Sequence, residues 1–481
     1  MRREVHIMIS KRMRIQFVAL CLVPFVCGLA LPSCEPNTAG FVRISENGFD
    51  ADDNAMDWND YPQSMAYFIP DEAEQGHLYV GTSSGINELM AGTVGLLGND
   101  TGERPPEIRR YRPDIGEMTW QRVLDYRDEE DGPVYTSTGF RNMAQYRSDS
   151  DGINRLYAST FGAEPAVWRT ATGEPGSWER FYTITNSRGS IRAMAEHKGL
   201  LYLAIANDIE AGGAVLTTPG RILATDGETV WPVMEDGFGN PDNGAIMSLI
   251  SYNGWLYAGT ANNKTGFEIW KFEGPEEGDP IQIVDEGGTD QRNQTAITPY
   301  IYEGRLYWGS MIFMGMYLKG CVLLRINKDD TWDTIVGPDS LSGYGPGFDN
   351  RNNAYLWNMV EHDGWLYAGT ADFTAIQQAF VDNLDNFVRL IIQQLGERAT
   401  QHFADAAKRE PGLVGVLTQG GADLWKSQDG VHWTPVFKNG LGDTYNFGVR
   451  TMRSVDGELY LGVANLWDGF EIWRGLKVVQ D

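Results

Sequence analysis

A short strand pattern recurs along the whole chain and constrains its fold more than any other feature. The shared element is a Leu-Tyr pair followed, two residues after the Tyr, by Gly, Ser or Ala. It occurs at Leu78, Leu156, Leu201, Leu256, Leu306, Leu366 and Leu459. Successive copies are 78, 45, 55, 50, 60 and 93 residues apart, so the basic unit is near 50 residues. Repeats of this length, with several short strands in each, are typical of β-propeller blades.

The fourth copy shows the repeated unit most completely. Strand-like runs at 245–252, 255–260, 267–272 and 281–284 are separated by short polar connections. Asn253-Gly254 joins the first two runs and is a strong hairpin signal, because both residues tolerate positive φ. We therefore predict an all-β fold, namely a seven-bladed β-propeller with four strands in each blade.

The two ends of the chain are expected to close the ring. Residues 41–45 run into 46–49, a segment that matches the ends of other fourth strands at 235–238 and 438–441. We predict that this N-terminal strand is the outer strand of the last blade, which pairs both ends of the chain and leaves no open edge. The tail at 476–481 is the alternative source of that strand.

One turn resembles a known propeller motif. Residues 427–433, Ser-Gln-Asp-Gly-Val-His-Trp, resemble the Asp-box of bacterial BNR-repeat propellers, found in sialidases and in many non-enzymes, although one residue is missing between Asp and Gly. The Gly and Trp rhythm of residues 41–475 is also similar to that of kelch-like propellers. The resemblance implies a fold and not an activity. It also implies that Asp429 braces its own turn on the face opposite the ligand.

The first segment has the order of a secretory signal. Basic residues within positions 1–14 precede an apolar run at 15–31. Residues 31–34, Leu-Pro-Ser-Cys, resemble the lipobox of bacterial lipoproteins, which implies acylation of Cys34; ordinary cleavage after Ala30 is the alternative. We expect a signal peptide at 1–33 and a propeller at 34–481. The protein is then exported, either lipid-anchored in the periplasm or at the cell surface, or secreted.

The charge of the chain excludes one class of partner. The sequence has 39 Lys and Arg against 65 Asp and Glu, a formal net charge of −26. Nucleic-acid binding depends on basic residues that neutralise phosphates, so no nucleic-acid partner is expected. Beyond the signal, no apolar run reaches the roughly 20 residues that span a bilayer, so membrane attachment is expected through a lipid alone. We expect a monomer whose partner is a glycan or an envelope protein.

The sixth unit carries an insertion at 374–415 between its second and third strands. Apolar residues from Ile376 to Leu395 recur at spacings of three and four, which predicts an amphipathic helix, and a second helical stretch follows at 397–409. This connection belongs to the face on which propellers usually bind ligands. A lid over the site, a cover for the face and a partner-binding helix all remain open.

Polar and aromatic residues are expected at the same face. Four units place an Asn 13 residues before the Leu of the repeat: Asn243, Asn293, Asn353 and Asn446. They either close Asx-type turns or form a ring of amides for a sugar or a hard cation. Trp58, Trp357 and Trp467 lie outside the repeated strand positions and are the aromatic candidates for ligand contact.

Two arginines occupy equivalent positions. Arg192 and Arg450 each precede their Leu-Tyr pair by nine residues. In an acidic protein they are candidates to hold an anionic ligand, such as a uronate or sialate carboxylate, and structural ion pairs are the alternative. Sialidases use three arginines; the nearest third residue, Arg147, is shifted out of this spacing.

The segment 50–60 is the densest in oxygen ligands. Asp52, Asp53 and Asp57 make it a candidate Ca²⁺ loop, with a solvated acidic loop as the alternative. No other cofactor is expected, and the few histidines disfavour a zinc site or a Ser-His-Asp triad.

The sequence thus favours a ligand-binding or interaction module. The alternative is a carbohydrate-active enzyme, a hydrolase or lyase, that uses carboxylates such as Asp57, Asp60 or Asp443. Its catalytic residues are not assigned.

Overall fold

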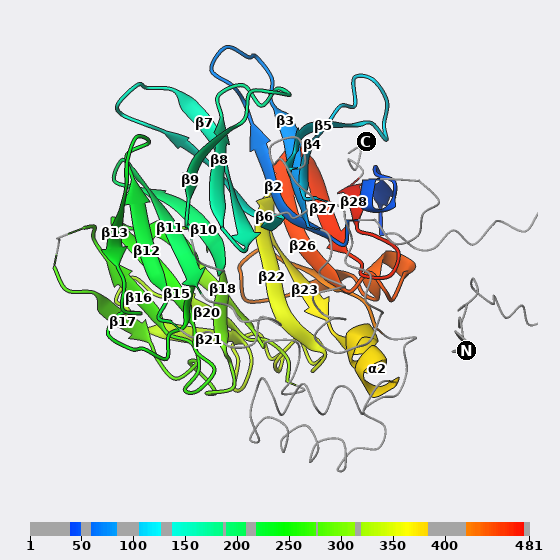
Figure 1. The fold of residues 1–481 in the computed structure, drawn as a ribbon. Helices are drawn as coiled ribbons and strands as arrows, with labels where there is room; N and C mark the ends of the chain where they lie inside the picture. The colour runs from blue at the N-terminus through cyan, green and yellow to red at the C-terminus, as the bar shows by residue number, and fades with distance from the viewer. Residues whose placement is uncertain are drawn as a thin grey trace, which may run out of the picture. The chain divides into compact units, whose positions relative to one another are not determined.

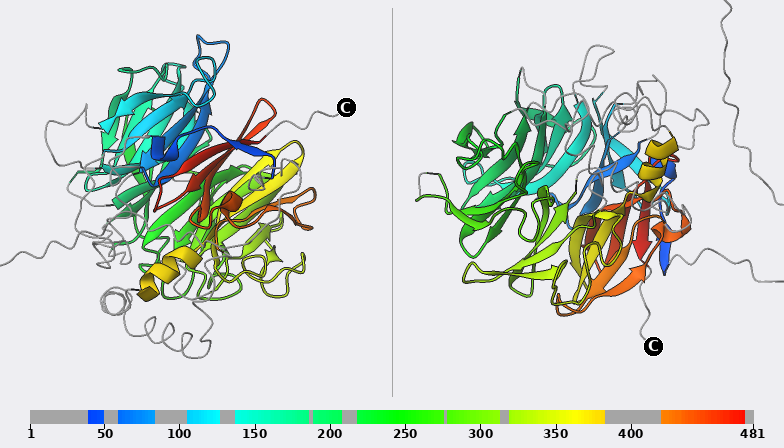
Figure 2. Two further views of the ribbon diagram at one scale, coloured as in Figure 1. Left: turned by 90° about the vertical axis from the view of Figure 1, so that its right-hand side faces the viewer. Right: turned by 90° about the horizontal axis from the view of Figure 1, so that it is seen from below.

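The structure is a computed structural model that describes residues 39–49, 59–83, 105–126, 137–185, 189–207, 218–275, 278–312, 319–382 and 420–475. All of these residues belong to one compact unit, Pro36–Asp481. Their backbone pairing places the described strands in seven antiparallel groups of four, numbered here as blades 1 to 7. The groups follow one another around a common axis (Figures 1 and 2). The protein is therefore an all-β propeller.

Each blade runs from an inner strand near the axis to an outer one. Blades 1 and 2 contain β2 (Tyr61–Phe68), β3 (His77–Ser83), β4 (Glu107–Tyr111) and β5 (Trp120–Asp125), then β6 (Ser137–Arg147), β7 (Asn154–Gly162), β8 (Ala166–Thr170) and β9 (Glu179–Thr183). Blades 3 and 4 contain β10 (Gly189–His197), β11 (Leu200–Asn207), β12 (Arg221–Thr225) and β13 (Val230–Met234), then β14 (Ala245–Tyr252), β15 (Trp255–Ala261), β16 (Ile269–Phe272) and β17 (Ile281–Val284).

The remaining blades follow the same plan. Blades 5 and 6 contain β18 (Thr295–Tyr302), β19 (Arg305–Met311), β20 (Leu323–Ile326) and β21 (Trp332–Val336), then β22 (Asn353–His362), β23 (Trp365–Asp372), β24 (Leu424–Ser427) and β25 (Thr434–Phe437). Blade 7 contains β26 (Gly448–Val455), β27 (Glu458–Ala464), β28 (Glu471–Gly475) and β1 (Phe41–Arg43). The described helices are η1 (Asn47–Phe49), η5 (Gly440–Gly442) and α2 (Thr374–Asp382).

The two ends of the unit are joined as the sequence predicts. β1 pairs antiparallel with β28, with Phe41 opposite Gly475 and Arg43 opposite Trp473. The outer strand of blade 7 therefore comes from the N-terminal part of the unit, which brings the blue β2 beside the red β26 and β27 in Figure 1. This closure removes the free sheet edge that an open array would expose. The alternative source, 476–481, lies outside the described residues.

The Tyr of the repeated pair packs between blades. Tyr307 in β19 lies against Gly430, in the turn after the third strand of blade 6, so closely that a Cβ at this position would collide with the Tyr hydroxyl. In the same turn the Asp429 carboxylate accepts hydrogen bonds from the backbone N–H groups of Val431 and His432, at 2.8 Å each. The prediction that Asp429 braces its own turn is confirmed.

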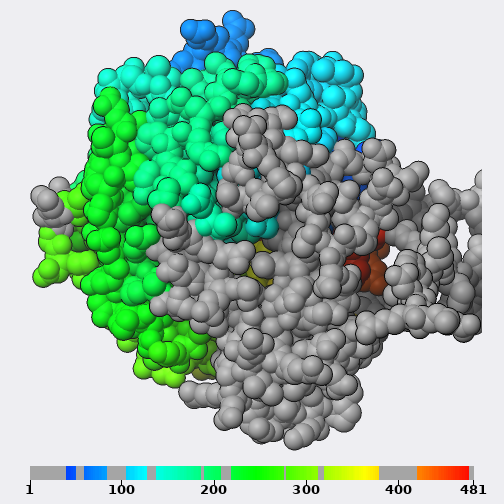
Figure 3. All heavy atoms as spheres, in the orientation of Figure 1, coloured from blue at the N-terminus to red at the C-terminus, as the bar shows by residue number. Residues whose placement is uncertain are grey.

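A second set of contacts joins neighbouring blades at the hairpins. A Tyr at the end of an inner strand donates its hydroxyl to the Gly carbonyl of the next blade's hairpin in three places: Tyr146 to Gly199, Tyr252 to Gly304 and Tyr302 to Gly364, each at 2.8 Å. These hydrogen bonds join blade 2 to blade 3, blade 4 to blade 5 and blade 5 to blade 6. In the space-filling view, the parts of the chain coloured cyan to green lie against one another (Figure 3).

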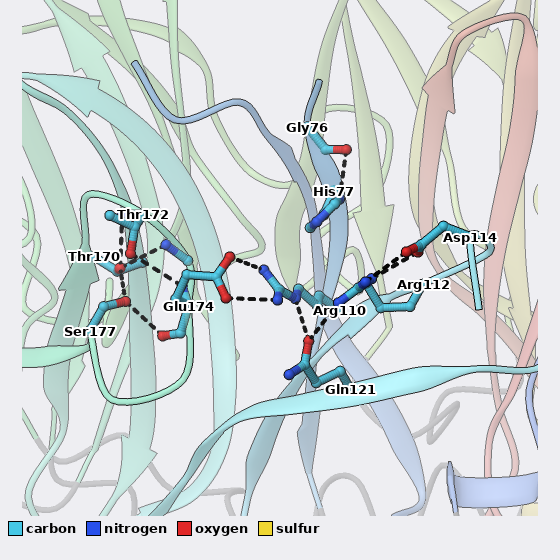
Figure 4. Close-up of polar contacts among 11 residues, drawn as sticks. Gly76, His77, Arg110, Arg112, Asp114, Gln121, Thr170, Thr172, Glu174 and Ser177 are labelled. Carbon is cyan, nitrogen blue, oxygen red and sulfur yellow. Dashed lines mark hydrogen bonds and ion pairs between the residues drawn. The ribbon is translucent and has the colours of Figure 1, made fainter. Parts of the chain in front are cut away.

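Blades 1 and 2 are also joined by an ionic contact. Arg110 of β4 is buried and makes two hydrogen bonds, of 2.5 and 2.8 Å, to the Glu174 carboxylate in the turn between β8 and β9 (Figure 4). The oxygen of Gln121 accepts hydrogen bonds from both Arg110 and Arg112. The bond from Arg110 lowers the pKa of Glu174. This brace lies at the hairpin face of the propeller, away from the connections between blades.

The insertion of blade 6 begins as a helix, in agreement with the sequence. α2 starts two residues after β23, and Asp372 accepts the backbone N–H of Thr374 at 2.8 Å, which satisfies one of the N–H groups that have no partner within the first turn of a helix. Ile376 packs into the apolar cluster near the axis. The rest of the predicted insertion, 383–415, lies outside the described residues. No helix in the described ranges is long and apolar enough to cross a membrane.

Candidate ligand site at the propeller axis

Every inner strand has a β-bulge at the same place. In blade 3, for example, Ile191 pairs with Ile205 and Ala193 with Ala204, which leaves Arg192 without a partner residue. Side chains normally alternate between the two faces of a strand, and a bulge interrupts this alternation, so the extra residue can direct its side chain differently from its neighbours. The seven equivalent bulge residues, here called the axial ring, are Gln63, Arg141, Arg192, Met247, Ile297, Trp357 and Arg450.

Four of the seven axial-ring residues are polar. Blades 7, 1, 2 and 3 contribute Arg450, Gln63, Arg141 and Arg192 in that order. The Gln63 Oε1 atom accepts hydrogen bonds from Arg450 Nη2 and from Arg141 Nη1, both at 3.1 Å. Side chains from three neighbouring blades therefore meet at one point, which shows that the bulge residues of blades 7, 1 and 2 converge.

The arginines of the ring have no acidic partner within the described part of the chain. None of Arg141, Arg192 and Arg450 forms an ion pair there, although all three are half-buried and a partly desolvated guanidinium without a counter-charge is costly. Burial, and then the positive charge of Arg450, lowers the pKa of Arg192 to about 9. Burial lowers the pKa of Arg450 to about 10. These groups stay charged at neutral pH in a poorly hydrated place, so an anion there would relieve their repulsion.

The other three residues of the ring are apolar. Met247 and Trp357 belong to a buried cluster with Tyr61, Tyr355 and Phe447, here called the axial apolar cluster, and Ile297 packs against it. The Trp357 ring centroid is 5.8 Å from that of Tyr61 and 5.4 Å from that of Tyr355. The guanidinium carbon of Arg450 lies 5.2 Å from the Trp357 centroid. Cationic and aromatic groups thus adjoin at the axis.

The structure brings together the two predicted arginines and adds a third. Arg192 and Arg450 occupy the same ring, as their equal spacing indicates. Arg147 does not join them, because it pairs with Asp71 at the hairpin end of β6. The third ring arginine is Arg141, which sequence spacing missed. The hairpin of blade 2 runs from Arg147 to Asn154 instead of closing in two residues, and allowing for this longer turn restores the register of Arg141.

The four repeated asparagines are fully buried. In each, the side-chain Nδ2 donates to the carbonyl of the Gly six residues earlier, at 2.8 to 3.1 Å. In three blades it also donates to a buried carboxylate: Asn243 to Glu268, Asn353 to Asp423 and Asn446 to Glu471. Asn293 instead donates to Thr289, and Lys319 donates to its side-chain oxygen. These amides hold the connections that enter the inner strands, in accord with the turn-closing alternative. Their direct contact with a ligand stays a prediction.

The remaining predicted residues fall into two groups. Trp357 lies in the axial ring, and Trp467 packs against the axial apolar cluster. Trp58, the metal candidates Asp52, Asp53 and Asp57, and Cys34 lie outside the described residues. No group of three or more His, Cys, Asp or Glu among the described residues could hold a metal ion.

Two of the carboxylates named for the enzymatic alternative are described. Asp60 is buried directly before Tyr61, and its charge contributes to raising the Tyr61 pKa, after burial and the influence of Tyr355. Asp443 accepts the backbone N–H of Tyr445 at 2.9 Å. Asp60 is the described acid nearest in sequence to an axial-ring residue, whereas Asp443 lies in the connection that enters blade 7.

Comparisons with known proteins describe similarity of fold only. No family model matches the sequence, and a search of the curated proteins finds no match. Among solved structures, an ancestral GH74 enzyme is similar with a TM-score of 0.49 and 11% identity over 88% of this chain and 48% of that chain. This chain thus spans about half the length of that enzyme. YCF48 bound to a D1 peptide has a TM-score of 0.46 and 11% identity over 87% and 94% of the two chains. A chain of a mitotic checkpoint complex has a TM-score of 0.46 and 10% identity over 97% and 100%. At these values the similarities carry no argument about ligand or activity.

Proposed function

We propose that this protein is a ligand-binding propeller whose axial ring holds the carboxylate of an acidic glycan. One observation carries the proposal: Arg141, Arg192 and Arg450 meet at the axis without an acidic partner in the described chain, although the protein as a whole is strongly acidic. Guanidinium groups bind carboxylates through paired, charge-assisted hydrogen bonds. A carboxylate is therefore the group that best satisfies this cluster.

The three apolar residues of the ring favour a sugar acid over an inorganic anion as the ligand. Met247, Ile297 and Trp357 face the same axis from blades 4, 5 and 6. A pyranose ring has apolar C–H faces that pack on such side chains, while its carboxylate projects from the edge of the ring. A uronate or a sialate has this combination, with the charge toward blades 7 to 3 and a ring face toward Trp357.

The setting of this function is part of the proposal. We propose that the signal sequence exports the protein and that Cys34 anchors it by a lipid, so that the propeller meets glycans or proteins of the cell envelope. The resemblance to BNR and kelch-like propellers is compatible with this setting. Binding of Ca²⁺ by Asp52, Asp53 and Asp57 is a further proposal, which a thermal-shift comparison of EDTA with Ca²⁺ tests.

A carbohydrate-active enzyme is the second candidate. The observation that favours it is the buried carboxylate of Asp60. Asp60 precedes Tyr61, and the positive charge of Arg450 acts to lower the pKa of Tyr61, against the larger effect of burial. An acid close to a bound sugar acid is the starting point for general acid-base chemistry. Release of new reducing ends from acidic oligosaccharides, lost in Asp60→Asn, is the result that supports catalysis over binding.

Calorimetric titration of the chain from residue 34 onward, with Cys34→Ser, tests the binding proposal. Galacturonate and N-acetylneuraminate are the probes, and the neutral sugar galactose is the ligand control. We expect at least one acid to bind, and Arg192→Gln or Arg450→Gln to weaken binding about tenfold or more. Arg147→Gln, which removes an exposed ion pair at the hairpin face, is the matched control and should leave affinity unchanged. Equal binding of galactose, or equal loss in all three variants, contradicts the proposal.

A further inference from the structure

Tyr445 is unusual among the aromatic residues of the described chain. Its side chain is 36% exposed, whereas the other large aromatic residues of the described ranges are buried or half-buried. Its ring lies next to Trp467, with the centroids 4.9 Å apart and the planes tilted by 41°. An aromatic pair that faces water is costly unless something packs on it.

Hydrogen bonds fix the backbone that carries both rings. The N–H of Tyr445 donates to Asp443, and the N–H of Trp467 donates to Asn465, each at 2.9 Å. The Asn465 side chain in turn donates to the Oδ1 atom of the buried Asn446, at 3.1 Å. The two connections that carry the rings are thereby linked to each other, which limits the backbone freedom that binding would cost.

The pair lies on the face of the propeller that carries the connections between blades. Tyr445 precedes β26 by three residues, in the connection from blade 6, and Trp467 lies between β27 and β28 of blade 7. Trp467 packs against the axial apolar cluster. Arg450, on β26, is only five residues after Tyr445. The aromatic pair therefore borders the axial ring on its blade 7 side.

We propose that Tyr445 and Trp467 form a second sugar subsite, so that the ligand is an acidic oligosaccharide and not a single sugar acid. The acidic unit occupies the axial ring, and the neighbouring sugar packs a C–H face on Tyr445. This inference rests on the proposed function and extends it to the length of the ligand.

The chemistry around the pair favours a sugar over a protein partner. Asp443 and Asp468 flank the two rings in sequence, and carboxylates are good acceptors for sugar hydroxyls. Among the described residues, the exposed apolar side chains of blades 1 and 2, Ile69, Ile115, Met118 and Ile153, lie on hairpin turns of the opposite face. Ile281 lies at the start of the outer strand β17, and Leu341 lies in the connection between blades 5 and 6. Within the described ranges Tyr445 is the one large aromatic side chain that is exposed, so the aromatic surface is small, which suits one pyranose ring better than a broad protein interface.

The test compares short and long ligands on matched variants. Affinities of galacturonate and trigalacturonate, and of N-acetylneuraminate and 3′-sialyllactose, are measured for wild type, Tyr445→Ala, Tyr445→Phe and Arg450→Gln. We expect the oligosaccharide to bind more tightly than its monosaccharide in wild type. Tyr445→Ala should weaken the oligosaccharide about three- to tenfold and leave the monosaccharide unchanged. Tyr445→Phe keeps the aromatic ring, so this variant should still bind the oligosaccharide more tightly than the monosaccharide.

The outcomes separate this inference from the function on which it rests. Unchanged oligosaccharide affinity in Tyr445→Ala, with loss of both ligands in Arg450→Gln, overturns the subsite and keeps the axial site. Binding of neither monosaccharide nor oligosaccharide overturns both. Tyr445 is exposed, so its substitution should not unfold the protein; an unchanged melting temperature checks this point.

Discussion

Gln63 places its side-chain oxygen 3.1 Å from the Nη2 atom of Arg450, and the same oxygen accepts a hydrogen bond from Arg141. One neutral amide is thus shared by two cationic groups from the blades on either side. A carboxylate at this position would neutralise them inside the protein, and the presence of an amide instead leaves their charge for another partner.

Gln63→Glu should convert the axial site into an internal ion pair. The variant supplies the acid that the arginines lack, so we expect a higher melting temperature and at least about tenfold weaker binding of an acidic sugar. Gln121→Glu is the matched control, because Gln121 is also shared by two arginines, Arg110 and Arg112, at the hairpin face (Figure 4). Calorimetry should show that Gln121→Glu binds the acidic sugar with the affinity of the wild type. Weakened binding in both variants would point to a general effect of the added negative charge.

Gly430→Ala should destabilise the fold strongly. Gly430 has φ +72°, and a Cβ there collides with the Tyr307 hydroxyl. Left-handed strain and overpacking together suggest a loss of about 2–4 kcal/mol in the free energy of unfolding, measured by urea denaturation. Gly254→Ala, at φ +82° with open space around it, should lose only about 1–2 kcal/mol. Adding Tyr307→Phe to Gly430→Ala removes the colliding hydroxyl and should restore part of the lost free energy of unfolding. If the double variant is no more stable than Gly430→Ala, the hydroxyl is not the obstacle.

Asn446→Ala should cost stability. Its amide donates to the Gly440 carbonyl and to the Glu471 carboxylate, both inside the protein. Removing it leaves a buried carboxylate with fewer donors, for which we expect a loss of about 2–4 kcal/mol in urea denaturation. Gln282→Ala, at an exposed amide side chain of the outer strand β17, should stay within about 0.5 kcal/mol. A fully stable Asn446→Ala variant that loses only ligand affinity would instead support the amide-ring prediction.

The free energy of unfolding should fall as the pH rises from about 4 to about 6, because the carboxyl of Asp423 is buried in the folded protein. Burial is the main cause that raises the pKa of Asp423 to about 6. In that window the folded carboxyl keeps a proton that the unfolded chain has released, so deprotonation costs folding free energy. Asp423→Asn has no such proton. Relative to wild type, its free energy of unfolding should therefore rise by about 2–3 kcal/mol between pH 4 and pH 8. A constant difference across this range would show that Asp423 ionises normally.

The sequence by itself determined the propeller class, the hairpins and the closure. These follow from local signals: a Leu-Tyr strand repeat, turn residues that accept positive φ, and a match between the segment at 46–49 and the ends of other fourth strands. Such signals act between near neighbours or recur at every unit, so they can be read without knowing which strands meet.

Only the tertiary structure decided which polar side chains converge at the axis. Arg141 is 15 residues before Leu156, whereas Arg192 is nine before Leu201, and a longer hairpin hides their equivalence until the strands are paired. The buried state of Asn243 and Asn446 likewise depends on Glu268 and Glu471, each 25 residues further along the chain. Burial and counter-charge are properties of what surrounds a side chain in space, and spacing along a sequence does not contain them.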